Sequence, residues 1–231
     1  MYIEGWRKLH PDYEIRLWTE NDVDMHKYPL VAKALKERRW ALASDIIRMY
    51  VIYEEGGFYL DTDVELVKSL EEFRQYDAVA GWESNYWFTT AVFGAKKHSP
   101  WIGKILKRYE FANDKKITTA TFLKTVHSAS VYAKDIYGLK LDGKTRVYGD
   151  KALAVFAREY FSPKHYITGE LNITKNTVAI HRYASTWHGP LVKFKDRMMR
   201  LAFRLFGERG YAKLERHYNA KLERKIRKEL P

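Results

Sequence analysis

The sequence predicts an α/β fold, and three observations support this prediction. Segments with helical periodicity alternate along the chain with short apolar segments typical of strands. The composition, 46% hydrophobic and 15% aromatic, is that of a folded protein. The length of 231 residues fits one domain, or one domain with an appendage. The absence of cysteine excludes a disulfide framework, a thiolate nucleophile and a cysteine-based zinc site.

The N-terminal part is expected to be mainly helical. The expected elements are, in order, a helix end at Ile3–Leu9, a strand over Tyr13–Trp18, and helices over Leu30–Arg38 and Trp40–Glu54. On the last of these helices, Asp45 and Arg48 are three residues apart and share a face. Gly56 and Gly57 are expected to end it, because glycine accepts the left-handed conformation that closes a helix.

The next part alternates strands and helices. Strands are expected over Phe58–Glu65, Asp77–Glu83 and Thr89–Ala95, helices over Ser99–Asp114 and Thr118–Tyr137, and a strand followed by an aromatic loop in TVAIHRYASTWHG, which begins at Thr177. We expect this domain to end near residue 190, which gives domains of 1–190 and 191–231.

The C-terminal tail carries most of the excess positive charge. From Leu191 to Pro231 there are 13 Lys/Arg and 5 Asp/Glu, a net +8 out of the total of +12. Within Leu191–Phe206, apolar residues such as Met198 and Leu201 occupy one helical face and basic residues the remainder. Such a basic amphipathic helix either packs on the domain or lies on an anionic membrane surface. The concentration of charge in this helix argues against a nucleic-acid partner.

The chain has no apolar run of eighteen residues, and its N-terminus lacks the apolar core of a signal peptide. We therefore expect a cytoplasmic protein, either soluble or peripheral on the inner face of the membrane.

Two carboxylates, Asp61 and Asp63, are expected at the end of a hydrophobic strand. Residues two apart in a strand point to the same side, so both could address one divalent cation. A site in which carboxylates bind the ion and leave some of its coordination positions open suits Mg²⁺ or Mn²⁺. An Asp-X-Asp tripeptide without further context is nevertheless more often a pair of solvated carboxylates at the end of a strand. Asp45 and Arg48 likewise allow two interpretations, a structural ion pair or a site for sugar hydroxyls and anionic charge.

The segment ALASDIIRMYVIYEEGGFYLDTDVELVKSL closely resembles the signature of glycosyltransferase family 32, which includes bacterial capsular polysaccharide enzymes and yeast mannosyltransferases. The resemblance covers about Trp6–Trp187 and includes HRYASTWH, which is similar to the C-terminal element of the family. The signature positions are Ala43, Ser44, Asp45, Arg48, Gly56, Gly57, Tyr59, Asp61 and Asp63.

The resemblance implies a GT-A type fold, a Rossmann-like mixed sheet flanked by helices, and metal-dependent, retaining transfer from a nucleotide sugar, with a UDP-sugar favoured. The acceptor would be a glycan or a lipid-linked acceptor in capsular polysaccharide synthesis. The implied assignments are Asp63, Asp61 and His181 for Mn²⁺ or Mg²⁺, Asp45 and Arg48 with the two acids for catalysis, and Trp18, Ser44, Tyr59, Ser185 and Trp187 for substrate binding.

Two departures from the family pattern leave alternatives open. Family members usually begin with a strand of the type Ile-Pro-Lys-Ile-Ile-His-x-x-Trp that lines the base pocket, and this chain starts after it. We expect either a truncated chain or a base held by another residue, such as Trp18. The family also often has Asn-Thr-Gly where this chain reads FTTAVFG, which affects the acceptor side around Glu83–Thr90. The alternative function is a catalytically disabled protein that still binds a nucleotide sugar.

Overall fold

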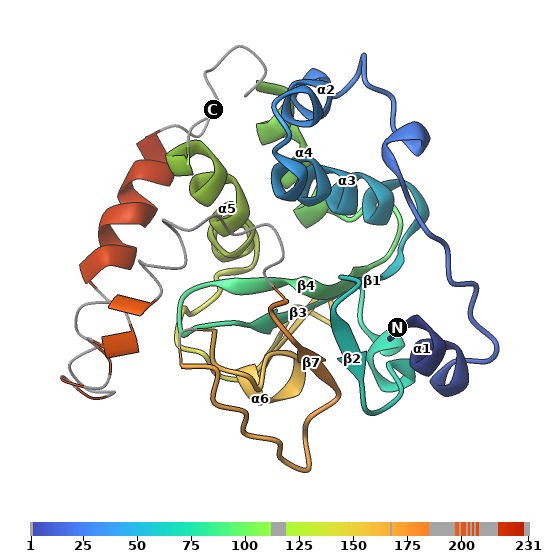
Figure 1. Ribbon diagram of the computed structural model, residues 1–231, viewed down its shortest axis with the longest axis vertical. Coiled ribbons are helices and arrows are strands. Elements are labelled where there is room, and N and C mark those ends of the chain that lie inside the picture. The colour runs from blue at the N-terminus through green and yellow to red at the C-terminus, as the bar shows by residue number, and fades with distance from the viewer. Residues whose placement is uncertain are drawn as a thin grey trace.

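The computed structural model describes residues 2–111, 119–166, 168–184, seven positions from 197 to 207, and 217–228. At its centre is a five-stranded mixed sheet (Figure 1). The strands, in spatial order, are β1 (Gly57–Leu60), β4 (Phe88–Ala95), β3 (Ala78–Trp82), β6 (Leu153–Phe156) and β5 (Arg146–Tyr148). Only β3 and β6 run parallel, and the other neighbours pair antiparallel. The predicted α/β class with a mixed sheet flanked by helices is confirmed.

Helices cover both faces of this sheet. In Figure 1, α2, α3, α4 and α5 lie on one side of the sheet and α6 lies on the other. The helices are α1 (Ile3–Leu9), α2 (Pro29–Lys36), α3 (Trp40–Glu55), α4 (Pro100–Phe111), α5 (Thr119–Tyr137) and α6 (Arg158–Phe161), with 3₁₀ turns η1 (Glu20–Asp22) and η2 (Glu71–Gln75).

Side chains of the central strands alternate between two hydrophobic cores, as the two-residue period of a strand requires. In β3, Ala80 and Trp82 pack in the core under α2 to α5, whereas Val79 packs in the core that also contains Trp6 and Phe161. The sheet is therefore buried on both faces, which makes it a rigid platform for the residues at its edges.

The strand expected over Phe58–Glu65 is wrong as a single element. The chain leaves the large sheet at Leu60, makes a turn in which the Val64 N–H donates to the Asp61 carbonyl (2.9 Å), and enters a separate two-stranded sheet. This second sheet pairs β2 (Val64–Leu66) antiparallel with β7 (Ala179–His181). Asp61 and Asp63 consequently lie in a turn between two sheets.

The strand expected over Tyr13–Trp18 is also wrong. This segment has no strand partner among the described residues, and Leu17 is 71% exposed. The whole segment lines a cavity beside β1. Conversely, β5, β6 and α6 were not predicted, although the apolar run around Val155 after Gly149 carries a strand signal.

The predicted end of α3 is confirmed at the glycine pair. Gly56 and Gly57 have φ values of 74° and 93°, a region that only glycine adopts at little cost. A Cβ at Gly56 would lie 2.8 Å from the Lys97 backbone nitrogen. The pair therefore lets the chain turn from α3 directly into β1.

Part of the C-terminal tail packs on the domain. Residues 217–228 form a helix, shown in red in Figure 1 beside α5. Leu222 and Ile226 are buried with Trp87 and Val131, and the Trp87 indole N–H donates to the Asn219 side chain (2.7 Å). The division of the chain near residue 190 remains a prediction, but this helix is integrated with the core.

Most of Leu191–Phe206 lies outside the described residues. The described positions from 197 to 207 are helical, and three apolar side chains among them, Met198, Leu201 and Leu205, are exposed. Within the described part of the chain, no helix combines the length and apolar character needed to cross a bilayer.

We expect Ile226→Ala to lower the free energy of unfolding by about 2–4 kcal/mol, because it removes a fully buried side chain. Thermal or urea unfolding measures the change. The matched control is Arg224→Ala, an exposed position on the same helix, which should leave stability nearly unchanged. An unchanged midpoint for Ile226→Ala would contradict the docking of this helix.

Candidate functional site

The buried face of α3 supplies a charged network. Asp45 and Arg48 are only 5% and 6% exposed, and their side chains form an ion pair with Nη2 3.1 Å from Oδ1. The Arg48 guanidinium also donates to the Ser44 hydroxyl (3.1 Å) and to the Thr90 carbonyl on β4 (2.6 Å). A buried guanidinium requires this degree of pairing, since an unpaired buried charge is very costly.

Arg48 also holds Asp61 at the end of β1. The two terminal guanidinium nitrogens lie 3.2 Å from the two Asp61 carboxylate oxygens, a bidentate arrangement. The Tyr59 hydroxyl donates to the same carboxylate (2.8 Å), and the guanidinium packs over the Tyr59 ring. These contacts fix Asp61 before any ligand binds. All of these contacts of Arg48 are with protein groups. Its predicted contact with a nucleotide-sugar donor remains untested.

Asp45 is the least satisfied member of the network. Its Oδ2 is buried and has no hydrogen-bond partner among the described residues. Burial raises the pKa of Asp45 to about 7; Arg48 opposes this shift and Asp61 adds to it. The predicted contact of Asp45 with sugar hydroxyls remains untested, and the side chain lines neither of the two cavities described below.

This pKa predicts a pH-dependent stability. A carboxyl whose folded-state pKa is raised stabilises the protein fully below its unfolded-state pKa, and the stabilisation is lost as the pH rises toward the folded value. Relative to Asp45→Asn, which does not titrate, the wild type should lose stability between about pH 4 and about pH 7, on the order of 1 kcal/mol per pH unit. Melting curves of both proteins across this range measure the difference. Parallel pH profiles would contradict a protonated, buried Asp45.

The turn after β1 brings Asp63 to His181 at the end of β7. His181 Nε2 lies 3.4 Å from Asp63 Oδ1, and Asp63 Oδ2 accepts the backbone N–H of Ala184 (2.8 Å). Burial opposes ionisation of Asp63, but the hydrogen bonds from His181 and Ala184 outweigh it and hold its pKa below the ordinary value. Asp63 is therefore ionised at neutral pH.

Three predicted metal ligands converge in this turn. One ligand atom from each of Asp61, Asp63 and His181 lies within 4.8 Å of the other two. The His181 Nδ1 is buried without a hydrogen-bond partner among the described residues, so the imidazole retains an unused ring nitrogen. Two carboxylates and one imidazole suit Mn²⁺, with carboxylates alone sufficient for Mg²⁺. The residues fit a divalent cation. Because Arg48 and Tyr59 already bond to the Asp61 carboxylate, Asp61 suits a water-mediated contact with the cation, whereas Asp63 suits a direct one.

Glu83 and Tyr183 extend the site beyond the predicted residues. The Tyr183 hydroxyl donates to Glu83 Oε1 (3.0 Å), and the Tyr183 ring packs against the His181 ring with centroids 3.9 Å apart. Burial raises the pKa of Glu83, which also feels the charges of His181 and Asp61. Glu83 was predicted only as part of the acceptor-side segment Glu83–Thr90. No role was predicted for Tyr183, although it lies in HRYASTWH.

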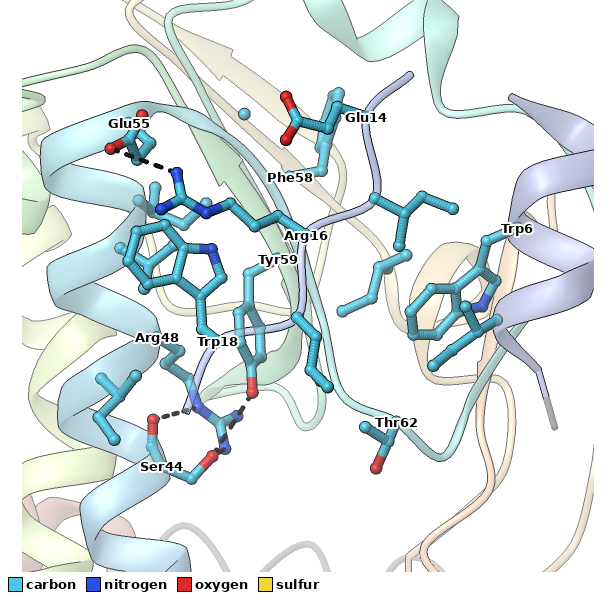
Figure 2. Close-up of a pocket in the computed structure, with 18 of the residues that line it drawn as sticks. Trp6, Glu14, Arg16, Trp18, Ser44, Arg48, Glu55, Phe58, Tyr59 and Thr62 are labelled. Atoms are coloured by element: carbon cyan, nitrogen blue, oxygen red, sulfur yellow. Dashed lines mark hydrogen bonds and ion pairs between the residues drawn. The ribbon is translucent and has the colours of Figure 1, made fainter. Parts of the chain in front are cut away.

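A cavity of about 660 Å³ adjoins this network (Figure 2). Trp18, Ser44 and Tyr59, all predicted to bind substrate, line it together with Arg48 and Thr62. Figure 2 shows Trp18 projecting beside Tyr59, with Arg16 packed over the indole (4.1 Å). An ion pair between Arg16 and Glu55 (3.9 Å) connects this segment to α3. The structure thus brings together three of the five predicted substrate residues, while Ser185 and Trp187 lie outside the described residues.

The sequence resembles known sugar transferases over its N-terminal third. Residues 1–80 match the family described as the glycosyltransferase sugar-binding region containing the DXD motif. The match includes Asp45, Arg48, Asp61 and Asp63, and it supports the assignment to glycosyltransferase family 32.

Curated relatives are mannosyltransferases of two yeasts. Inositol phosphoceramide mannosyltransferase 3 of Schizosaccharomyces pombe is 28% identical over 103 residues, which are 43% of this chain and 29% of the relative. Mannosyl phosphorylinositol ceramide synthase CSH1 of Saccharomyces cerevisiae is 26% identical over 113 residues, or 46% of this chain and 30% of the relative. The chain therefore spans less than a third of the length of these relatives.

Among solved structures, the PaToxG glycosyltransferase is similar with a TM-score of 0.42 and 18% identity. The similarity covers 57% of this chain and 50% of the PaToxG chain.

Proposed function

Because residues 1–80 match the DXD sugar-transferase family, we propose that this protein is a metal-dependent glycosyltransferase. It moves a hexose from a nucleotide sugar to a glycan or lipid-linked acceptor. The observation that carries the proposal is the convergence of Asp61, Asp63 and His181 within 4.8 Å, next to a cavity large enough for a nucleotide sugar.

Asp63 and His181 would hold the cation directly, and Asp61 would contact it through water. A divalent cation bound there would neutralise negative charge on the donor diphosphate. The protein groups around it are already ordered, since Arg48 and Tyr59 fix Asp61 and the Ala184 N–H fixes Asp63. Such preorganised groups stabilise charge without rearranging during the reaction.

The 660 Å³ cavity would hold the nucleoside of the donor. Trp18 would offer an aromatic face for the base, and it lines the same cavity as Tyr59 and Thr62, the neighbours of Asp61 along the chain. We favour a UDP-sugar from the sequence, while the names of the relatives make a mannosyl donor the alternative to test.

We propose transfer with retention by attack from the same face of the sugar. The acceptor oxygen forms the new bond to the anomeric carbon as the bond to the diphosphate breaks, and the acceptor proton passes to the departing phosphate oxygen. Asp45 is the alternative nucleophile for a double displacement. Its burial against Arg48 and its raised pKa both disfavour that role.

The tail would bring the enzyme to its acceptor. Exposed Met198, Leu201 and Leu205 alternate with Arg197 and Arg200 on the described helical positions, a pattern suited to an anionic membrane surface. A peripheral position on the inner membrane face would serve lipid-linked acceptors in capsular polysaccharide synthesis.

Donor hydrolysis tests the proposed function. The purified protein is incubated with Mn²⁺ or Mg²⁺ and a panel of UDP- and GDP-sugars, and released nucleotide is measured with and without EDTA. We expect one donor to be hydrolysed in a metal-dependent manner. Hydrolysis of no donor by the folded protein would instead support the alternative of a disabled protein, which calorimetry with the same panel would detect as nucleotide-sugar binding.

A further inference from the structure

A second cavity, of about 330 Å³, opens where β3 ends. None of the residues predicted for catalysis, metal or substrate binding whose side chains are described lines it, although it adjoins the start of the segment Glu83–Thr90 that the family resemblance associates with the acceptor. Its described lining comes from five parts of the chain: the end of β3 and the following loop, the loop before β5, α6, the segment after α6, and the tail. The lining residues used below are Glu83, Asn85, Arg158, Glu159, Tyr166 and Asn172.

The side chain of Tyr183 connects this cavity to the candidate metal site. Glu83 lines the cavity and accepts the Tyr183 hydroxyl (3.0 Å). The Tyr183 ring in turn packs on His181, whose Nε2 faces Asp63 (3.4 Å). The two cavities therefore adjoin different residues around the metal site, Thr62 in the large cavity and Glu83 in the small one.

The lining of the small cavity has the chemistry of a sugar site. Tyr166 is 43% exposed, and its ring stacks on that of His165 with 16° between the ring planes. An aromatic face of this kind suits the apolar face of a sugar ring. Asn85 and Asn172 each offer one acceptor and two donors for hydroxyl groups. The carboxylate of Glu83 has lone pairs beyond the one used by Tyr183.

The described lining residues carry charges of both signs. Glu83 and Glu159 line the cavity together with Arg158, and burial raises the pKa of Glu83, which favours its neutral form. Carboxyl, guanidinium and amide groups together suit the hydroxyl groups of a neutral polyol. The volume is at the lower end of the range for small-molecule sites, which suits one sugar ring.

We propose that this cavity binds the acceptor as a neutral hexose, stacked on Tyr166 and hydrogen-bonded by Glu83, Asn85 and Asn172. The inference rests on the proposed function and adds its acceptor side. A hydroxyl group that bonds to Glu83 in this cavity is then connected to the metal site through Tyr183 and His181.

Ligand-observed NMR tests this inference without requiring turnover. The probes are methyl α-mannoside, methyl α-glucoside and methyl α-galactoside at millimolar concentration, added to the full chain. We expect saturation transfer to at least one glycoside, with its dissociation constant raised tenfold or more in Tyr166→Ala and in Asn172→Ala. Tyr218→Ala, an exposed tyrosine on the C-terminal helix that lines neither cavity, is the matched control and should bind as the wild type does.

Three outcomes would overturn the inference: no transfer to any of the glycosides, binding that survives both substitutions, or displacement of the glycoside by UDP or GDP. Circular dichroism and melting of each variant confirm that it is folded. Donor hydrolysis by the wild type reports the proposed function separately. Glycoside binding without hydrolysis would show a sugar site in this cavity but refute its role as an acceptor site, and hydrolysis without glycoside binding would sustain the proposed function and overturn this inference.

Discussion

Asp63→Asn is expected to lower donor hydrolysis by about 10²–10³-fold, because it removes the ionised ligand nearest His181. The asparagine keeps the shape of the side chain and its oxygen can still accept the Ala184 N–H, so the melting temperature should change little. Initial rates at saturating Mn²⁺ and donor measure the effect, and higher Mn²⁺ should restore only part of the activity.

The matched control for this prediction is Asp77→Asn. Asp77 is a half-exposed carboxylate before β3 that pairs with Lys96, far from the DXD turn in the sheet. It makes the same chemical change and should retain the wild-type rate. If Asp63→Asn hydrolyses the donor as fast as this control, Asp63 does not hold the cation and the assignment of the site is wrong.

Arg48→Gln is expected to lower the free energy of unfolding by about 3 kcal/mol or more, because it leaves Asp45 and Asp61 without their shared cation in a buried setting. For a protein of this size that corresponds to a melting temperature lower by roughly 10 °C. Hydrolysis should also fall, since Asp61 loses the bidentate contact that fixes it.

A double variant distinguishes the loss of charge pairing between Arg48 and Asp61 from a general packing effect. In Arg48→Gln/Asp61→Asn the uncompensated carboxylate is gone, so part of the lost stability should return while activity stays low. Arg74→Gln, which removes an exposed ion pair with Glu71, should leave the melting temperature nearly unchanged. Equal melting temperatures for Arg48→Gln and the wild type would show that the network does not stabilise the fold.

The main helices and the candidate residues of the site could be predicted from the sequence. Period and capping signals are local, so α3, its glycine end and α4 appeared where expected. Asp45, Arg48, Asp61 and Asp63 could be named because their spacing along one short segment is itself the signal. The composition and the alternation of segments were enough for the α/β class.

Strand pairing could not be predicted in this way, because it depends on partners that are distant in sequence. The segment Tyr13–Trp18 has a strand pattern but pairs with no strand in the described part of the chain, and Phe58–Glu65 divides between two sheets. The two acids nevertheless meet. They do so because a turn between the sheets brings Asp61 and Asp63 to His181, and not because they alternate along one strand.

The sequence by itself determined which residues are candidates for the site and which helix carries Asp45 and Arg48, since both depend on neighbours along the chain. Only the tertiary structure decided what those residues contact. It pairs Arg48 with Asp61, buries Asp45 with one oxygen that has no hydrogen-bond partner in the described part of the chain, and joins Glu83 to His181 through Tyr183 across about a hundred residues of chain. The physical reason is that burial and charge pairing are set by the packing of the whole sheet and its helices, which no local pattern encodes.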